Sequence, residues 1–462
     1  MLDKKIDIET LGEHFQSNPF LWAGYRALFV LANDNETPEE QTVPLLRSIF
    51  FMPAIIGFLT YKRMTALVTN TSDVERSFEH LISITSTSEY RSYTLVEVAK
   101  ELQQRDEDVL LLCSPSAEGR MTEWQDVAPT VKHRDLHRRI PVKKIIRLPV
   151  DSVRMTLELK SIISSEQLSI HSFIFAHNLL LLELIKHHSI VDLCRDDPAV
   201  HTLKPMPYFL EATKANRIYV YQHGTQVRYP DWVWPGVNAN NVSYDLKASI
   251  PFYIPLTYFV WGEPWKRNFE RIAHRDSVIH VTGSPWYDNL ASTNRSKHET
   301  DIDVLFVSQS HAVEPQTQEA YEELVKRLVE FCSMRDFTFA VKLHPRESMS
   351  WYEKRGLDEY VQEFDDIDTA LLRSRVAVTD TSTAFIEASV LGTPSIVADV
   401  SGRNLSSLAP VKNVRFTDGI GKIETHLEEL LGSDEDQSTE GTELIRISKA
   451  TDEIIHIIRE NN

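Results

Sequence analysis

The sequence of 462 residues is poor in cysteine. Its three cysteines, Cys113, Cys194 and Cys332, stand far apart and form no CxxC pair. This spacing excludes a cysteine-rich zinc module and provides no disulfide framework. A reducing, cytoplasmic compartment therefore fits the cysteine usage best.

Long hydrophobic runs are also scarce. The first twenty residues mix charged and apolar positions, so they contain no apolar segment typical of a secretory signal. The most apolar run, residues 49–59, contains Pro53 and has about half the length needed to cross a bilayer. We expect a core segment there. Because Lys62 and Arg63 follow it, peripheral contact with the inner face of the membrane is the alternative.

Positive charge is limited, with 49 Lys and Arg residues against 67 Asp and Glu residues and a formal net charge of −18. This balance argues against binding to nucleic acid, and any bound phosphate must be held by local geometry. The motifs GxxxxGKS/T, GxSxG and HExxH and the Gly-rich dinucleotide fingerprint are missing. Their absence argues against an ATPase, a serine hydrolase, a metalloprotease and a dehydrogenase.

Short apolar runs alternate with helical patterns from about residue 90, which favours parallel sheets covered on both faces. The chain is also too long for one typical core. We therefore expect an α/β protein with two doubly wound, Rossmann-like domains that face each other across a cleft. The expected boundaries are 1–85 for an N-terminal helical appendage, 86–292 for the first domain, 293–302 for a linker, 303–432 for the second domain and 441–462 for a C-terminal helix that packs back on the domains.

The second half has the clearest patterns. They predict strands at 304–308, 337–343, 376–379 and 395–397 and helices at 316–332, 367–373 and 384–391. In a doubly wound domain, ligands bind at the carboxyl ends of the strands. Functional residues are therefore expected in the loops that follow these strands.

Hydroxyl and carboxyl side chains follow the strand at 376–379, directly before a helix. A helix N-terminus offers unpaired N–H groups and partial positive charge, so Ser382 and Thr383 are candidates for binding a phosphate. Glu387 lies one turn further on the same face as Thr383, within reach of a ribose diol. The alternative is that residues 380–383 only cap the helix.

The strand at 337–343 leads into His344, Pro345 and Arg346. Pro345 ends the strand, and His344 could bind a phosphate or protonate a leaving oxygen. Lys342 and Arg346 flank it and raise the local positive potential, so Arg346 is included among the expected nucleotide-binding residues. The alternative is a turn histidine that bonds the backbone.

A third strand pattern, at 219–221, precedes Gln222, His223 and Gly224. The glycine permits a tight turn or a close approach of the backbone to a ligand. His223 could act as a general base or orient an acceptor, with Gln222 and Gly224 on the acceptor side. The alternative is a histidine that is satisfied within the core.

Two Asp-x-Asp triplets, Asp301 with Asp303 and Asp366 with Asp368, resemble pairs that hold a divalent ion on phosphates. The first pair lies in the expected linker, and the second lies at an expected helix start, where carboxylates act as caps. We therefore expect neither pair to bind a metal.

Five segments occur in an order that resembles GT-B glycosyltransferases. They are YVYQHGTQ (219–226), YFVWGEPWKRNFE (258–270), VTGSPWYDNL (281–290), VKLHPRE (341–347) and TDTSTAFIEASVLGTPSI (379–396). More narrowly, the chain is similar to the group of CDP-glycerol glycerophosphotransferases and bacterial capsule or lipooligosaccharide sialyltransferases. These enzymes share a His-Gly turn, a His-Pro loop and a Ser/Thr-rich helix start. The resemblance covers about residues 205–400.

The resemblance implies that His344, Ser382 and Thr383 bind the phosphate or pyrophosphate of a donor nucleotide. It implies that Glu387 binds the ribose of that nucleotide and that His223 faces the acceptor as a catalytic base. Enzymes of this fold usually need no bound metal for phosphate activation, which agrees with the interpretation of the two aspartate pairs.

The chain also departs from this group. The Trp that often precedes His-Gly is replaced by Gln222. The acidic pair followed by Gly, which supplies the base in some capsule sialyltransferases, is not evident.

The sequence thus predicts a cytoplasmic transferase without a metal or other cofactor. It would move a sugar or a polyol phosphate from a nucleotide-activated donor, of CMP, CDP or UDP type, to a surface glycan or a lipid-linked acceptor. One alternative is a nucleotide-sugar epimerase or hydrolase on the same fold. The other is a non-catalytic scaffold that binds glycan or nucleotide.

Overall fold

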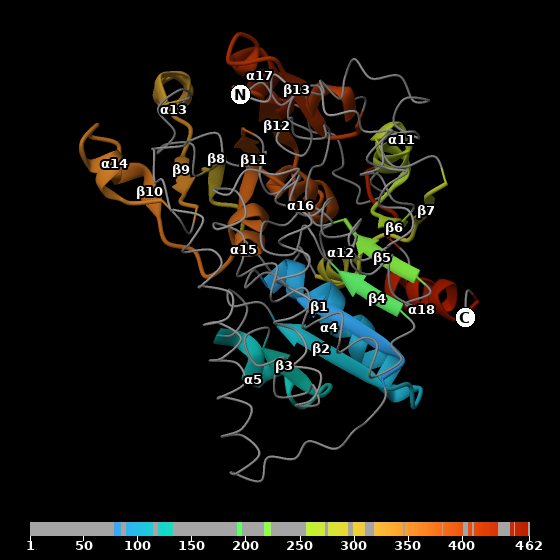
Figure 1. Cartoon of the computed structure of the whole chain (residues 1–462). Coiled ribbons are helices and arrows are strands. Elements are labelled where there is room, and N and C mark those ends of the chain that lie inside the picture. The colour runs from blue at the N-terminus through green and yellow to red at the C-terminus, as the bar shows by residue number, and fades with distance from the viewer. Residues whose placement is uncertain are drawn as a thin grey trace, which may run out of the picture.

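The strands of the chain form two parallel sheets, one in each half (Figure 1). The computed structural model describes residues 78–84, 89–113, 119–132, 192–195, 217–222, 256–272, 276–293, 299–309, 318–344, 347–380, 382–400, 405–408, 411–432, 444–447 and 449–460.

The first sheet contains seven described strands in the order β3-β2-β1-β4-β5-β6-β7, and every neighbouring pair is parallel. Its strands are β1 (His80–Ile84), β2 (Val109–Cys113), β3 (Thr130–Lys132), β4 (Asp192–Arg195), β5 (Arg217–Tyr221), β6 (Thr257–Val260) and β7 (Val278–Val281). The central strands β1 and β2 are buried along their whole length, as expected for a parallel sheet covered on both faces.

Helices of the first half pack on this sheet, and the last helix of the chain joins them. These helices are α4 (Glu89–Gln104), α5 (Met121–Trp124), α11 (Glu263–Ile272), α12 (Pro285–Ala291) and α18 (Ala450–Glu460). Ile454 and Ile458 of α18 lie in one buried cluster with Leu95 of α4 and Leu111 of β2. The chain therefore returns to its first sheet at its end, where α18 contacts α4.

The second sheet has six described strands, again all parallel, in the order β10-β9-β8-β11-β12-β13. They are β8 (Ile302–Val307), β9 (Phe339–Lys342), β10 (Val361–Gln362), β11 (Ser374–Thr379), β12 (Ser395–Ala398) and β13 (Val414–Thr417). The order runs outward on both sides of the β8–β11 pair, as the order of the first sheet does around β1 and β4. The expected α/β fold with two doubly wound domains is confirmed.

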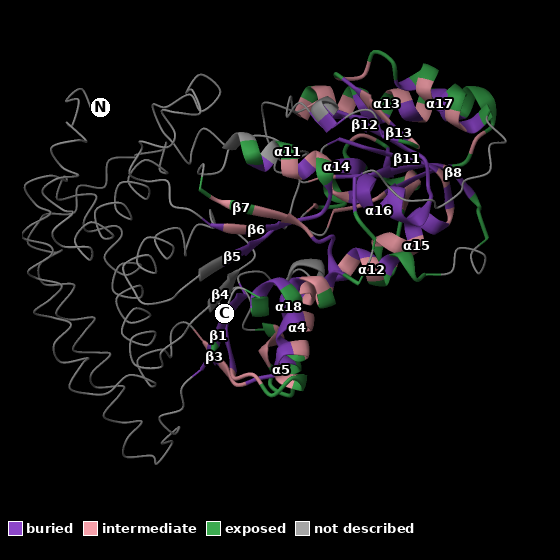
Figure 2. Cartoon of the chain, turned by 90° about the vertical axis from the view of Figure 1, so that its right-hand side faces the viewer, coloured by how far each residue is buried: buried purple, intermediate pink, exposed green. Residues whose placement is uncertain are grey.

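Helices cover both faces of the second sheet (Figure 2). α13 (Gln318–Arg335) and α17 (Ile423–Gly432) lie on one face, and α15 (Ile367–Leu372) and α16 (Ala384–Leu391) lie on the other. Short turns of helix complete this half: α14 (Ser350–Glu353), η6 (Asp358–Tyr360) and η7 (Leu405–Leu408). The two halves meet where α12 contacts α16.

Two boundaries differ from the sequence prediction. Residues 80–84, expected in an appendage, form the central strand β1, because an isolated short apolar run gives no sign of its partners. The C-terminal helix begins at Ala450 rather than at 441. Residues 444–447 are not helical, because their backbone bonds the edge of the first sheet instead: Arg446 N–H donates to the carbonyl of Trp261, 2.8 Å away.

The structure also bears on the membrane question. Within the described ranges, none of the helices is both long enough and apolar enough to cross a bilayer. Residues 49–59 lie outside these ranges.

Candidate functional site

Most of the described candidate residues gather at the carboxyl edge of the second sheet. Strand β8 pairs with β9 on one side and with β11 on the other. Ser308 follows β8, His344 follows β9 by two residues, and Ser382 follows β11 by three. Because these strands are parallel neighbours, all three residues lie at the same edge, beside the point where the strand order reverses. Ligands of doubly wound sheets bind at this position.

Helix α16 begins at this edge. Thr383 is its N-cap residue, and the Ser382 hydroxyl accepts a hydrogen bond from the Ala384 N–H, with an Oγ–N distance of 3.2 Å. Ser382 thus satisfies one N–H group at the helix start, as the capping alternative predicts. The positive end of the helix dipole still points to the carboxyl edge, where it favours an anion.

Glu387 lies one turn inside α16 and is only 6% exposed. Burial, and after it the nearby Asp368 carboxylate, raises the pKa of Glu387 to about 8. The side chain is therefore mostly a neutral carboxylic acid at pH 7. A neutral carboxyl offers one O–H donor together with acceptor oxygens, a set that can bond a hydroxyl pair.

The main chain of His344 is fixed by two neighbours. Its N–H donates to the Ser308 hydroxyl and to the Glu347 carboxylate, each 3.1 Å away. Lys342, two residues earlier, is half-buried, and burial lowers the pKa of its ammonium, while the Asp366 carboxylate opposes this shift. Arg346 lies outside the described residues. Lys342 thus brings an ammonium group, and His344 an imidazole, to the edge where α16 begins.

Sequence reasoning missed Ser308 and Glu347. Ser308 is the polar last residue of the strand predicted at 304–308, and Glu347 follows the strand predicted at 337–343 and ends the segment VKLHPRE. The rule that polar residues at strand ends form the site could therefore have found both. No spacing in the sequence shows that Glu347 turns back to the main chain of His344, because this contact forms only in the folded loop.

On the first sheet, Gln222 is the one predicted acceptor-side residue within the described ranges. It is 6% exposed, and its amide oxygen accepts a hydrogen bond from the N–H of Trp261 at 3.0 Å. Its own N–H donates to the carbonyl of Phe259, also at 3.0 Å. Gln222 thus joins the ends of β5 and β6. His223 and Gly224 lie outside the described residues.

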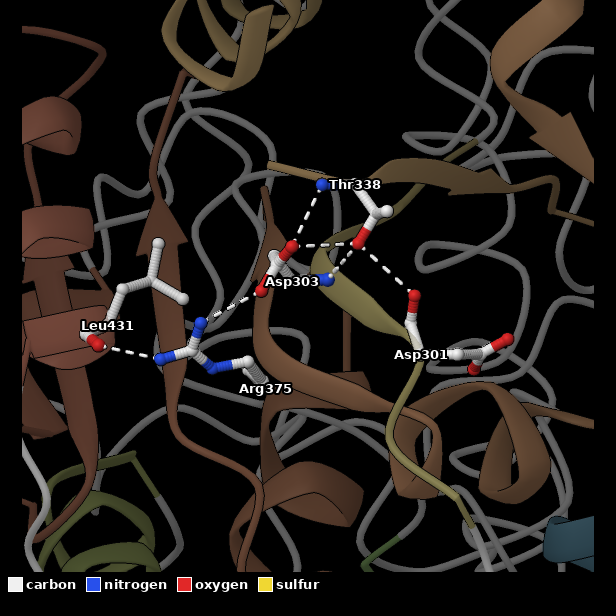
Figure 3. Close-up of polar contacts among 5 residues, drawn as sticks. All are labelled: Asp301, Asp303, Thr338, Arg375 and Leu431. Carbon is white, nitrogen blue, oxygen red and sulfur yellow. Dashed lines mark hydrogen bonds and ion pairs between the residues drawn. The ribbon is translucent and has the colours of Figure 1, made fainter. Parts of the chain in front are cut away.

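The first Asp-x-Asp pair lies at the opposite, amino edge of the second sheet (Figure 3). Asp303 belongs to β8 and not to a linker, and its N–H donates to the carbonyl of Thr338, directly before β9, at 3.1 Å. One carboxylate oxygen of Asp303 lies 2.8 Å from the Arg375 guanidinium, and the other accepts two bonds from Thr338. Burial would raise the pKa of Asp303, but the bonds from Arg375 and Thr338 outweigh it and lower the pKa. Its partner Asp301 pairs with Arg373.

The second pair lies near the candidate site. Asp366 is the N-cap of α15, and its carboxylate accepts a hydrogen bond from the N–H of Thr369 at 2.6 Å. The capping role expected for this residue is confirmed. Its neighbour Asp368 belongs to the same helix, which contacts α16, and the Asp368 carboxylate adds to the rise in the pKa of Glu387.

Among the described residues, three potential metal ligands come together in one group, Glu79, His80 and Glu107. The group lies at the amino end of β1, at the edge of the first sheet away from the strand ends that bind ligands. His80 Nε2 is 2.6 Å from one Glu107 oxygen, and Arg459 lies 3.3 Å from the other. Each carboxylate oxygen of Glu107 therefore already has a nitrogen partner, His80 for one and Arg459 for the other.

No protein-family model matches the sequence, and a comparison with curated proteins finds no match either. Solved structures do match. One is assigned as a UDP-N-acetylglucosamine 2-epimerase from Listeria monocytogenes (TM-score 0.55, 13% identity, 83% of this chain and 96% of that chain). Another is UDP-GlcNAc 2-epimerase from Methanocaldococcus jannaschii (TM-score 0.52, 14% identity, 82% of this chain and 99% of that chain). A third is Alr3699/HepE from Anabaena in complex with UDP (TM-score 0.51, 11% identity, 83% of this chain and 100% of that chain).

The fold is of the GT-B type. Each match covers almost the whole of the other chain, so both sheets take part in the similarity. At these identities, the similarity concerns the GT-B fold and its strand order. The chemistry must be argued from the residues at the carboxyl edge.

Proposed function

We propose that this chain is a nucleotide-sugar enzyme that transfers a sugar or a polyol phosphate from a nucleotide-activated donor to a surface glycan or a lipid-linked acceptor. One observation carries the proposal: His344, Ser382 and the start of α16 lie together at the carboxyl edge of the second sheet, beside its switch point. This is where a GT-B fold has positive backbone charge and strand-end side chains available for a ligand.

In this proposal, His344 and the N-terminus of α16 bind the donor phosphate, with Arg346 beside them. They stabilise the negative charge that develops on the phosphate as the donor bond breaks. Ser382 and Thr383 add hydroxyl groups to the same site. The neutral carboxyl of Glu387 bonds the ribose hydroxyls.

The acceptor side belongs to the first domain. His223 takes the proton of the attacking hydroxyl, and Gly224 lets the backbone approach the acceptor. Loss of His223 should lower turnover by roughly 10²–10⁴-fold and leave donor affinity largely unchanged. The enzyme would act in the cytoplasm, with residues 49–63 as a candidate contact to the inner face of the membrane.

Several solved matches have UDP or UDP-GlcNAc bound, which supports a nucleotide-activated ligand for this chain. Because UDP-GlcNAc 2-epimerases are among the matches, epimerisation of a nucleotide sugar is a second candidate function. Product analysis separates the two: transfer releases the nucleotide and extends an acceptor, whereas epimerisation leaves the nucleotide sugar intact with an altered sugar.

A thermal-shift screen with CMP, CDP, UDP, GDP and TDP tests the proposal. A nucleotide present at 100 times its dissociation constant should stabilise the native state by roughly 2.7 kcal/mol, which raises the Tm measurably. The responding nucleotide identifies the donor class, and activity with sugars or polyol phosphates attached to it follows. If none of the five nucleotides raises the Tm, the proposal of a nucleotide-binding enzyme is wrong.

A further inference from the structure

The loops after β8 and β9 are joined by a closed circuit of hydrogen bonds. The N–H of Gln309 donates to the hydroxyl oxygen of Tyr321, 3.1 Å away. The Tyr321 hydroxyl donates to Glu347 Oε1 at 3.5 Å. Glu347 Oε2 accepts from the N–H of His344, and this N–H also bonds Ser308, the neighbour of Gln309 in the chain. The circuit thus returns to the loop where it started.

Glu347 occupies the central position in this circuit. Besides its side-chain bonds, its own N–H donates to the carbonyl of His344 at 2.9 Å. Both the N–H and the carbonyl of His344 are therefore held by Glu347. This reciprocal pair of bonds fixes the ends of the segment 344–347 against each other, much as a capping box fixes a helix start.

The surroundings of Glu347 are rigid and largely apolar. Tyr321 and Tyr352 are both fully buried, and their hydroxyl groups are 3.4 Å apart. The Tyr321 ring packs against Phe306 of β8 and Trp351 of α14. Among the described residues, the titratable side chains that face Glu347 are Tyr321 of α13 and Tyr352 of α14, whereas His344 contacts Glu347 through its main chain.

We propose that Glu347 is a positioning residue of the candidate site, which holds His344 in place and couples the loops after β8 and β9. The proposal rests on the proposed function, in which His344 contacts the donor phosphate. It adds to that function a residue that fixes the position of His344, the residue proposed to bind the phosphate.

The protonation state of Glu347 should change how firmly it holds His344. An ionised carboxylate makes charge-assisted bonds to the His344 N–H and to the Tyr321 hydroxyl. A protonated Glu347 carboxyl carries a proton on one of its oxygens. When this proton is donated to the Tyr321 oxygen, the hydroxyl proton of Tyr321 no longer bonds Glu347 and turns toward Tyr352. Burial raises the pKa of Glu347 to about 7, so the change falls within the working range of pH. The loop is held most firmly above that pH.

The variant Glu347→Gln tests the proposal because an amide mimics the protonated carboxyl at every pH. Tyr321→Phe removes the other end of the same bond and keeps the ring contacts with Phe306 and Trp351. Glu353→Gln, at an exposed position in α14, is the matched control for the change of charge. Melting curves of all three variants report whether the fold is retained.

Two measurements are made from pH 5.5 to pH 8.5. The first follows the backbone amide of His344 by NMR with selectively ¹⁵N-labelled histidine, assigned through a His344→Gln variant among the 17 histidines of the chain. The second is the dissociation constant of UDP and of CDP by calorimetry. In the parent protein, we expect the amide signal to titrate. We also expect the ratio of the parent's nucleotide affinity to that of Glu347→Gln to rise about five- to tenfold with rising pH, because deprotonation of the His344 imidazole affects both proteins alike. In Glu347→Gln, the amide titration should shrink.

The outcomes separate this inference from the proposed function. If UDP or CDP binds the parent and Glu347→Gln equally at every pH, or if the His344 amide titrates alike in both, Glu347 is not a positioning residue. If none of the five nucleotides of the thermal-shift screen binds the parent, the proposed function fails. The amide titration then still decides whether Glu347 holds His344.

Discussion

The carboxylate of Asp288 in α12 accepts a hydrogen bond from the N–H of Ala450, the first residue of α18, with an Oδ2–N distance of 2.5 Å. The two residues are 162 positions apart in the sequence. A side chain from the connection between the two sheets thus caps the helix that brings the chain back to the first sheet.

We expect Asp288→Ala to lower the free energy of unfolding by about 1 kcal/mol, because an N–H group at the start of α18 loses its acceptor. Urea denaturation measures the change. Glu270→Ala, at an exposed position in α11, removes the same charge without a cap and serves as the control. Equal midpoints for the two variants would show that the Asp288 bond contributes nothing.

Gly283 should tolerate no side chain. Its φ is +76°, and a Cβ atom there would meet the carbonyl oxygen of Arg446 at 2.1 Å. Gly283→Ala should therefore lose at least about 1–2 kcal/mol from backbone strain, with a further loss as residues 444–447 are displaced. Gly421→Ala is the control, because a Cβ atom there meets nothing within 4 Å. A Gly283→Ala melt that matches the control melt contradicts the packing described for this segment.

His344→Ala and Ser382→Ala should each weaken nucleotide binding by about 1.5–3 kcal/mol, because each removes a charge-assisted bond to phosphate. Ser382→Ala should also lose about 1 kcal/mol of stability, since the Ala384 N–H loses its partner. Calorimetry with the nucleotide that responds in the screen gives the affinity, and His456→Ala, at an exposed position of α18, is the histidine control. Parent-like affinity in both variants would place the phosphate elsewhere.

We expect the free energy of unfolding to depend on pH through Glu387. Its pKa of about 8 in the native state lies above the ordinary value of 4.5 that applies when the chain is unfolded. The protonated form is favoured by folding, so stability falls as pH rises from about 4.5 through 8. Glu387→Gln keeps the side chain neutral. It should equal the parent in acid and exceed it by a few kcal/mol above pH 8. A constant difference between their Tm values across this range would contradict the buried, neutral carboxyl.

The proposed reaction should proceed in the presence of chelator. Asp303 is bonded to Arg375 and Thr338, and Asp366 caps α15, so these carboxylates already have partners. The test compares turnover in EDTA with turnover after addition of Mg²⁺ or Mn²⁺, in the parent and in an Asp366→Asn, Asp368→Asn double variant. Activity that is lost with EDTA, restored by metal and absent from the double variant would make these aspartates metal ligands.

The sequence predicted the second sheet well because its elements have clear local ends. The helix predicted at 384–391 matches α16, which ends at Gly392 with a left-handed φ of 74° before Pro394. Strand β11 begins at Ser374, two residues before the predicted start at 376. Ser374 and Arg375 are polar, but Ser374 pairs with Ile302 of β8 and extends the strand. The ends of such a strand depend on backbone pairing with the neighbouring strand, which the pattern of apolar residues alone does not reveal.

The sequence could not predict contacts between distant segments. Leu444, Ile445 and Ile447 have helical spacing, yet residues 444–447 bond the ends of β6 and β7 instead, where Gly262 and Gly283 leave room for their backbone. The hold of Glu347 on His344 and the burial of Glu387 also arise from packing. The position of the candidate site could therefore be predicted from the strand ends in the sequence. The shifted pKa values of Glu347 and Glu387 depend on burial, which only the structure shows.

The chain crosses between the sheets twice, outward through α12 and back before α18, and these two helices contact each other. A single connection would let the halves twist freely about it. Two connections restrict this twisting, so we expect the two halves, or lobes, to open and close by a hinge rotation. The separation of two probes, one on each lobe, would then follow a single coordinate in a distance measurement.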